Sequence, residues 1–248
     1  MTNLLQCENL VLGYQAAKAN AAGIVAPFNF ELKAGEVVAL LGENGCGKST
    51  FLKTLCARLQ PVAGNVALCG RSLWGSDNAT WTARERAKLV TLVRMSGLVC
   101  DRMTVREFVS LGRTPYAGLF DGRSKEDEQI VDDAIALLDL ESFSNRWVNE
   151  LSDGERSRVY LAQAVAQQVK VLLLDEPNAF LDIPRSRKLF ALLQKLAKER
   201  NMGILVSTHS VEYAEKYCDR IAVIVDRQVR VAKSEDARAE GLLKWTEE

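Results

Sequence analysis

The residues with the clearest chemistry lie in segment 42–50, which reads Gly-Glu-Asn-Gly-Cys-Gly-Lys-Ser-Thr after an apolar run, Val37–Leu41. Its spacing matches the P-loop pattern, in which glycines let backbone N–H groups converge on phosphate oxygens. We expect Lys48 to reach the β- and γ-phosphates and the Ser49 hydroxyl to ligate Mg²⁺. The segment therefore predicts a site for a nucleoside triphosphate such as ATP, made by Gly42, Glu43, Asn44, Gly45, Cys46, Gly47, Lys48, Ser49 and Thr50.

Two neighbouring carboxylates follow a second apolar run, Leu172–Leu174. A carboxylate at the end of a buried strand is costly unless it meets a cation or strong donors. We expect Asp175 to hold Mg²⁺, directly or through water. Glu176 would then orient or deprotonate an attacking water. The alternative, a surface turn after a core strand, is less favoured beside a P-loop.

His209 is the only histidine and follows the run Ile204–Val206. Its residue type alone allows an ordinary structural role. Ser152 and Glu155 fit the Ser/Thr-x-x-acid pattern of a helix start, in which the hydroxyl and the acid satisfy unpaired backbone N–H groups. Ser152 is therefore a candidate N-cap, and a helix N-terminus is also a favourable place for an anion.

The elements that carry these residues alternate between strand and helix. Continuous apolar runs at 37–41, 172–174, 204–207 and 221–225 are typical of buried parallel strands, and 4–12 and 28–32 read as earlier strands. Helical spacing follows the P-loop up to Pro61, and helix starts are expected at Thr104, Ser124 and Ser152, with Asp182 capping a helix at Pro184. The pattern predicts an α/β fold, with a P-loop NTPase core of mainly parallel sheet, an N-terminal antiparallel β part and a helical insertion. We expect one domain over 1–248, with its core at 1–93 and 170–248 and the helical part at 94–169.

Composition narrows the function classes. The 248 residues carry 32 Lys and Arg and 32 Asp and Glu, so bulk charge does not favour nucleic acid or anionic lipid. No signal peptide and no membrane-spanning apolar run is evident. The cysteines are scattered, without metal-finger spacing, and only Cys46 lies in the P-loop, where alkylation would block ATP binding.

The order of three motifs resembles the ATPases of ABC transporters. These motifs are the P-loop, the signature-like segment Leu151–Arg156 and the segment Leu172–Pro177. The resemblance implies a head-to-tail homodimer, in which Ser152 of one copy contacts the γ-phosphate bound by the other. It also implies roles near ATP for Gly154, which leaves room for phosphate, and for Glu155.

Three further residues take roles from the same resemblance. His209 occupies the place of the histidine that contacts the γ-phosphate. Asp182 lies in the counterpart of the loop that follows the catalytic acid. Tyr14 lies where the family stacks an aromatic ring on adenine, although a core or surface tyrosine remains an alternative.

The chain departs from the family pattern at three positions. Asp153 and Glu155 stand where glycine and glutamine are commoner, so extra carboxylates lie near ATP. Arg94 stands where a glutamine usually contacts Mg²⁺ and the attacking water. Arginine cannot ligate a metal but can contact phosphate or a carboxylate. We therefore expect altered coupling rather than a lost ATPase.

The stretch Val105–Tyr116 is similar to the corresponding segment in importers of iron siderophores, haem and cobalamin. It implies an ATPase subunit at the cytoplasmic face of the membrane, held there by a multi-span permease that works with a substrate-binding protein. Two alternatives remain: a soluble ABC ATPase that serves iron–sulfur assembly or an exporter, and a nucleotide-gated module that does not hydrolyse ATP.

Overall fold

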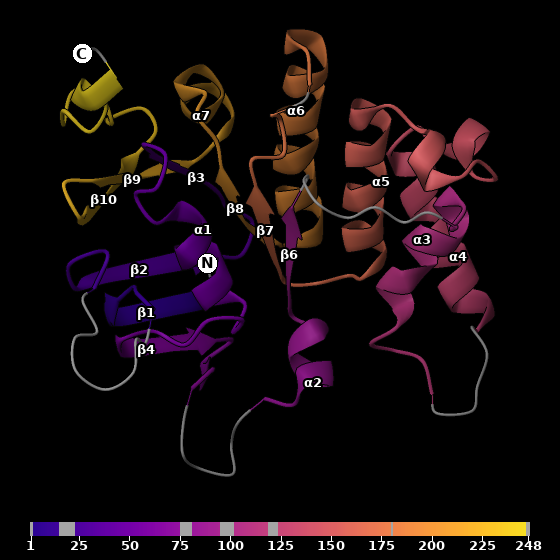
Figure 1. The fold of residues 1–248 in the computed structure, drawn as a ribbon, viewed down its shortest axis with the longest axis horizontal. Helices are drawn as coiled ribbons and strands as arrows, with labels where there is room; N and C mark the ends of the chain where they lie inside the picture. Colours follow the sequence, from indigo (N-terminus) through magenta and orange to yellow (C-terminus); the bar gives the residue numbers. More distant parts are fainter. Residues whose placement is uncertain are drawn as a thin grey trace.

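A six-stranded, mostly parallel sheet forms the centre of the molecule (Figure 1). The computed structural model describes residues 2–14, 23–74, 81–94, 102–118, 124–179 and 181–246. Only the edge strand β10 runs antiparallel to its neighbour. The strand order is β10 (Gln228–Lys233), β9 (Arg220–Val225), β3 (Val37–Gly42), β8 (Gly203–Ser207), β7 (Val171–Asp175) and β6 (Val90–Arg94).

A second, antiparallel sheet packs beside the first and is formed by the N-terminal part of the chain. Its order is β2 (Phe28–Lys33), β1 (Asn3–Val11), β4 (Ala63–Leu68) and β5 (Arg71–Ser72). The alternating burial of β2 is that of a strand with one face in a core. The expected fold class, a mainly parallel core with an N-terminal antiparallel part and a helical insertion, is confirmed.

Helices cover the parallel sheet and build the right-hand part of Figure 1, where α3, α4 and α5 lie together. The expected capping boxes at Thr104, Ser124 and Ser152 are all present, because each hydroxyl accepts from a backbone N–H three residues on. Asp182 caps its helix as expected. The helices are α1 (Lys48–Leu55), α2 (Ala83–Ala87), α3 (Val105–Ser110), α4 (Lys125–Leu137), α5 (Asp153–Ala166), α6 (Ile183–Arg200) and α7 (Val211–Tyr217), with short 3₁₀ turns at Leu111–Arg113, Glu141–Phe143, Val148–Glu150 and Lys244–Thr246.

The two faces of the parallel sheet contribute to two separate apolar cores. On β3, Ala39 and Leu41 belong to the core shared with α3–α7, whereas Val38 and Leu40 belong to the core shared with α1 and the antiparallel sheet. This alternation explains why all six residues of β3 are buried. The sheet is thus fixed from both sides, and its carboxyl edge is a rigid base for side chains.

One boundary and three elements differ from the sequence expectation. The helix after the P-loop was expected to continue to Pro61, but α1 ends at Leu55. Ala57 adopts the left-handed conformation at φ 56, and the bonds from Ala57 N to Thr54 O and from Arg58 N to Lys53 O close the turn. This is a Schellman ending without its usual glycine. The short elements β5, α2 and β10 were not predicted.

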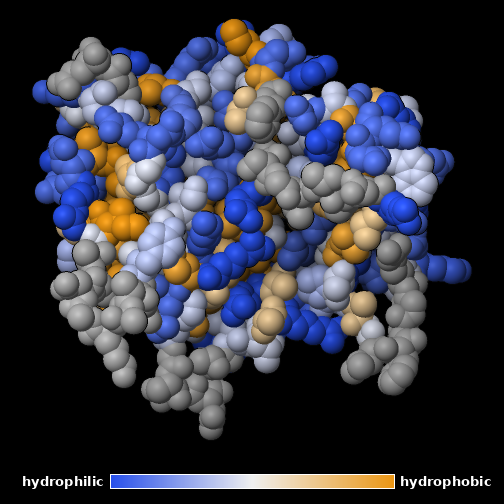
Figure 2. Space-filling model, in the orientation of Figure 1, coloured by the Kyte–Doolittle hydropathy of each residue, from blue (hydrophilic) through white to orange (hydrophobic). Residues whose placement is uncertain are grey.

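Polar side chains dominate the face that Figure 2 shows, where apolar side chains form scattered patches rather than one continuous area. Among the described residues, no helix combines the length and the apolar character that crossing a bilayer requires.

Candidate nucleotide-binding site

The P-loop joins the end of β3 to the start of α1. Gly47 is the residue before α1, at φ 117, and supplies no side-chain cap. The first backbone N–H groups of the helix therefore lack a capping acceptor, which makes the N-terminus of this eight-residue helix suited to an anion.

Gly42 shows why this loop needs glycine. Its φ is 146, in the region that favours glycine, and an added Cβ would lie 2.6 Å from the carbonyl oxygen of Ile224. Any larger residue would push the loop away from β9. The close approach of backbone to backbone sets the path of the loop at the sheet edge.

Lys48 extends its ammonium group back over the loop. Its side chain is buried, and Nζ donates to the carbonyl oxygens of Gly42 at 2.7 Å and Glu43 at 2.9 Å. No ion pair links Lys48 to a carboxylate anywhere in the described residues. Because an ammonium has three donors, one donor and the full charge remain for a phosphate.

Three residues from adjacent strands share one level at the carboxyl edge of the sheet. Asp175 on β7 pairs in register with Arg94 on β6 and with Ser207 on β8. Asp175 Oδ1 accepts from Ser207 Oγ at 2.9 Å and from Ser49 Oγ at 3.3 Å. The carboxylate therefore faces the P-loop hydroxyl, as the sequence led us to expect.

The donor set at this point fits a hard cation. A hydroxyl and a carboxylate are oxygen ligands of the kind Mg²⁺ accepts, with the rest of its shell from phosphates and water. No group of three or more His, Cys, Asp or Glu side chains in the described parts of the chain could hold a metal by itself. A cation between Ser49 and Asp175 would thus depend on the nucleotide for further ligands.

Glu176 occupies a strained position directly after β7. Its φ is 51, which is uncommon for a residue other than glycine and marks a position held by its surroundings. The backbone N–H of Glu176 donates to Ser207 Oγ at 2.9 Å, and Oε1 lies 2.9 Å from His209 Nε2. Both side chains remain partly exposed, so the carboxylate is fixed and still accessible to water.

The loop after Glu176 is tied to β8 as well. Thr208 Oγ1 donates to Asn178 Oδ1 at 3.1 Å. Asp182 accepts from the backbone N–H of Arg185 at 2.8 Å and is exposed at the start of α6. The expected site residue Asp182 is therefore an N-cap in this chain, with its second oxygen 3.7 Å from the Arg185 guanidinium.

Tyr14 and Cys46 flank the loop. The Tyr14 hydroxyl lies 3.3 Å from Thr50 Oγ1, while 55 % of the residue is exposed. An exposed ring next to the first turn of α1 is available for stacking on a planar base. Cys46 is half-buried, and its Sγ lies so close to Gly42 that an added Cβ there would meet it at 2.7 Å.

Ser152 and Glu155 form a closed pair at the start of α5. Ser152 Oγ donates to Glu155 Oε2 at 2.8 Å, and the Ser152 N–H donates to the same oxygen at 2.8 Å. Both hydrogen bonds lower the pKa of the Glu155 carboxyl, and the bond from the Ser152 backbone has the larger effect. No hydrogen bond or ion pair among the described residues joins Ser152 to segment 42–50.

The two residues that follow Ser152, Asp153 and Gly154, have different surroundings. Asp153 is exposed and lies 3.4 Å from the Arg156 guanidinium, an ion pair that offsets part of its charge. Gly154 was expected to leave room for phosphate. Within one copy of the chain, an added Cβ there would lie 3.1 Å from Arg185 Nη1 and 3.3 Å from Leu181 Cδ2. A larger residue at position 154 would therefore crowd the Arg185 and Leu181 side chains.

Sequence reasoning missed Ser207, which connects the two carboxylate positions. It is fully buried, donates to Asp175 and accepts from Glu176 N. The available signal was a hydroxyl residue at the end of an apolar strand, close to the only histidine.

Comparison with known proteins agrees with this geometry. The family described as ABC transporter matches residues 25–179. A petrobactin import ATP-binding protein of Bacillus anthracis is 38% identical over 79% of this chain and 70% of its own length. The chain belongs to the ABC transporter ATP-binding family. It is accordingly an ATPase, and ATP is its nucleotide.

Two solved structures share the fold of this ABC ATPase. An inward-facing metal-chelate type ABC transporter superposes with a TM-score of 0.81 and 26% identity, over 98% of this chain and 88% of that one. A dimeric bacterial ABC transporter cassette superposes with a TM-score of 0.78 and 26% identity, over 93% of this chain and 98% of that one.

Proposed function

We propose that this protein is the ATP-hydrolysing subunit of an importer for a metal chelate, of the iron–siderophore, haem or cobalamin kind. Three observations support the ligand class. The segment Val105–Tyr116 resembles that importer group, one relative is a petrobactin import protein, and one structural neighbour is a metal-chelate type transporter. The ligand itself would contact the permease and a substrate-binding protein rather than this subunit.

One observation carries the hydrolytic role. The Glu176 carboxylate is held by His209 at 2.9 Å, while its backbone is held by Ser207, directly beside the carboxylate that faces the P-loop. In this role Glu176 orients the attacking water and accepts its proton. His209 fixes the Glu176 side chain and contacts the γ-phosphate.

The remaining site residues bind and position the nucleotide. Backbone N–H groups of 42–50 and the Lys48 ammonium bind the phosphates, with Thr50 supporting the first turn. Ser49 and Asp175 hold Mg²⁺, which supplies charge neutralisation of the phosphates when bound. The Tyr14 ring stacks on adenine.

A second copy of the chain completes the site. Ser152 lies at an accessible helix N-terminus and makes no hydrogen bond to its own P-loop in the described residues. In a head-to-tail pair, Ser152, Gly154 and Glu155 of one copy face the phosphates held by the other, with Asp182 near the contact. A dimeric cassette among the structural neighbours supports this arrangement. Reciprocal contacts of this kind require two-fold symmetry.

The two parts of the chain have different tasks in such an importer. Residues 1–93 and 170–248 bind and hydrolyse ATP, and 94–169 transmit the closure of the dimer to a multi-span permease. The protein is held at the cytoplasmic face of the membrane through that permease. ATP favours the closed dimer because only that state makes both sets of phosphate contacts.

Arg94 changes the charge next to this site. Its register partner is Asp175, so a permanent cation is placed beside the proposed Mg²⁺ ligand. Within the described residues it forms no ion pair. We expect it to contact phosphate or Asp175 and so to alter how hydrolysis is coupled to the permease.

The test is phosphate release by the purified subunit, alone and with its co-purified permease. Glu176→Gln should abolish release while ATP binding is retained, because the substitution removes the base and leaves the phosphate contacts. Complete inactivity of the wild-type subunit with a permease would instead support a nucleotide-gated module. Co-purification with soluble assembly proteins, and no permease, would favour iron–sulfur assembly.

A further inference from the structure

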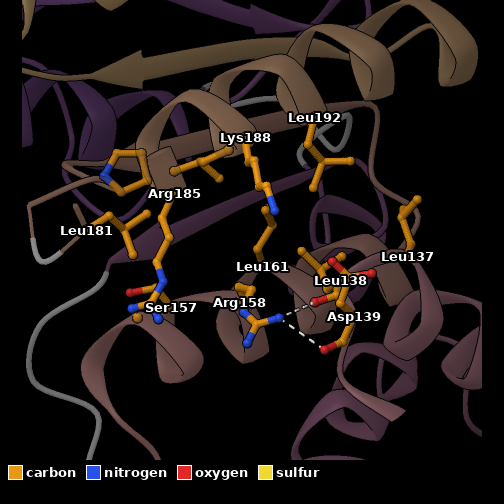
Figure 3. A pocket seen from close by; sticks show the side chains of 13 residues that line it. Leu137, Leu138, Asp139, Ser157, Arg158, Leu161, Leu181, Arg185, Lys188 and Leu192 are labelled. Carbon is orange, nitrogen blue, oxygen red and sulfur yellow. Dashed lines mark hydrogen bonds between the residues drawn. The ribbon is translucent and has the colours of Figure 1, made fainter. Parts of the chain in front are cut away.

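A cavity of about 310 Å³ separates the helical part of the molecule from the core helix α6 (Figure 3). One wall is a single face of α5, which includes Leu161. The opposite wall is a face of α6, on which Lys188 and Leu192 lie one helical turn apart. The end of α4 closes one side with Leu137. None of these residues belongs to the P-loop or carries the proposed chemistry of hydrolysis.

The walls are apolar, and the charges on them are mostly positive. Leucine is the commonest residue type in the lining, whereas the ionisable lining residues are three cations, Arg158, Arg185 and Lys188, and one acid, Asp139. Figure 3 shows the Arg185 and Lys188 side chains extending from α6 towards α5. The cavity therefore combines an apolar interior with a cationic margin.

The three cations are not equivalent. Arg158 donates to the carbonyl oxygens of Leu138 and Asp139 at 3.0 Å each, so it holds the end of α4. Arg185 is only loosely paired with Asp182, at 3.7 Å on the exposed side of the helix. Lys188 forms no ion pair with any described carboxylate. Lys188 and Arg185 are thus the charges available to a ligand.

We propose that this cavity binds a small amphiphilic anion, whose apolar chain lies between the leucines of α5 and α6 and whose acidic group contacts Lys188 and Arg185. The cavity volume is at the lower end of the range for ligand pockets, about 300–1,000 Å³, which suits a medium-length chain. An anion is selected because it replaces lost hydration with charge-assisted hydrogen bonds, which a neutral or cationic head group cannot do.

The cavity adds a property that the proposed transport function does not include, because a ligand bound there would change the activity of the ATPase. The cavity lining includes Gly154, which is itself assigned to the ATP-sandwich contact, and Leu181, which precedes Asp182 near that contact. A ligand that contacts α5 and α6 together stabilises the present arrangement of these helices. By linkage, a nucleotide that changes that arrangement changes the affinity for the anion.

The test is calorimetric titration of the purified nucleotide-free protein with octanoate, using octanol and octylammonium as probes with the same chain. Octanoate should bind in preference to both. Lys188→Glu should weaken octanoate binding about tenfold, because the attractive contact becomes repulsive. Lys195→Glu changes the same charge at an exposed position of α6 outside the lining and should leave the affinity unchanged.

Three results would overturn the proposal: no octanoate binding to the wild type, equal binding of octanol, or equal weakening by the two charge reversals. Lys188→Met keeps the helix and removes only the charge. This variant replaces Lys188→Glu in the binding test if Lys188→Glu alters the melting temperature. ATP binding measured on the same samples reports on the P-loop separately, so the two proposals can fail independently.

Discussion

Ser152 is assigned two roles, and Ser152→Ala separates them by magnitude. As the N-cap of α5, the hydroxyl accepts from the Glu155 N–H and donates to the Glu155 carboxylate. Loss of an N-cap costs about 1 kcal/mol of stability. For a chain of this length, that corresponds to a fall of about 2–4 °C in melting temperature.

The second role predicts a much larger effect on ATP-driven dimerisation. A hydrogen bond to a charged phosphate contributes about 1.5–3 kcal/mol. Each dimer would lose two such bonds, so the free energy of association falls by about 3–6 kcal/mol, or about two to four orders of magnitude in affinity. Phosphate release should fall with it, because the site is completed only in the dimer.

Ser124→Ala is the matched control. Ser124 caps α4 with the same box, accepting from the Asp127 N–H and donating to its carboxylate, but lies outside the proposed contact with ATP. The two variants should lose similar stability in thermal unfolding. Dimerisation is measured by size exclusion with ATP in the Glu176→Gln background, where hydrolysis does not dissociate the pair. The trans role of Ser152 is refuted if Ser152→Ala dimerises like its parent, or if Ser124→Ala fails equally.

Three further measurements test individual parts of the structure. Ala57→Gly should raise the free energy of unfolding in urea by about 1 kcal/mol, since Ala57 ends α1 at φ 56; an unchanged midpoint would contradict the strain. Alkylation of Cys46 should block ATP binding, and ATP binding by the Cys46→Ser variant should be unaffected by the alkylating reagent. Mass spectrometry should find Cys218 unmodified, because burial raises the pKa of its thiol. The Arg113 guanidinium beside Asp127 holds the pKa of that carboxyl below its usual range. The ion pair therefore contributes fully to stability at pH values above the pKa of the unfolded chain, about 3.9, and this contribution is lost as the pH falls through the folded pKa. Asp127→Asn should therefore flatten the loss of stability below about pH 4, and an equally steep loss would exclude this pair as a cause.

The sequence predicted helix starts well, because the residues that form each start lie close together in the chain. The capping boxes depend on residues three apart, and each formed as the spacing indicated. The end of α1 was missed because Ala57 performs the turn that glycine usually marks. The edge strand β10 was missed because half of its residues are polar and exposed, and its pairing with β9 decides its conformation.

The site residues were predictable as motifs, but their connections were not. Lys48, Ser49, Asp175, Glu176 and His209 were all chosen from order and type. Which oxygen each donor reaches depends on the register of parallel strands, and register is a property of the sheet. Ser207 carries the link between the two carboxylates for this reason, because it is the β8 residue level with Asp175.

Two of the three departures from the family pattern, Asp153 and Arg94, differ in how far their charges are offset. Asp153 is exposed at the start of α5 and already paired with Arg156 at 3.4 Å, so water and the arginine reduce its field at a neighbouring ATP. Arg94 lies level with Asp175 on an adjacent strand, close to where the phosphates and the cation would be held. Opposite charges about 4 Å apart interact by about 1 kcal/mol in water and by about 4 kcal/mol at the effective dielectric of a protein surface. In the proposed dimer, closure around ATP would exclude water and so raise the interaction from the first value towards the second. We therefore expect the influence of Arg94 to grow as the dimer closes, and we expect Arg94 to be the departure that acts on coupling.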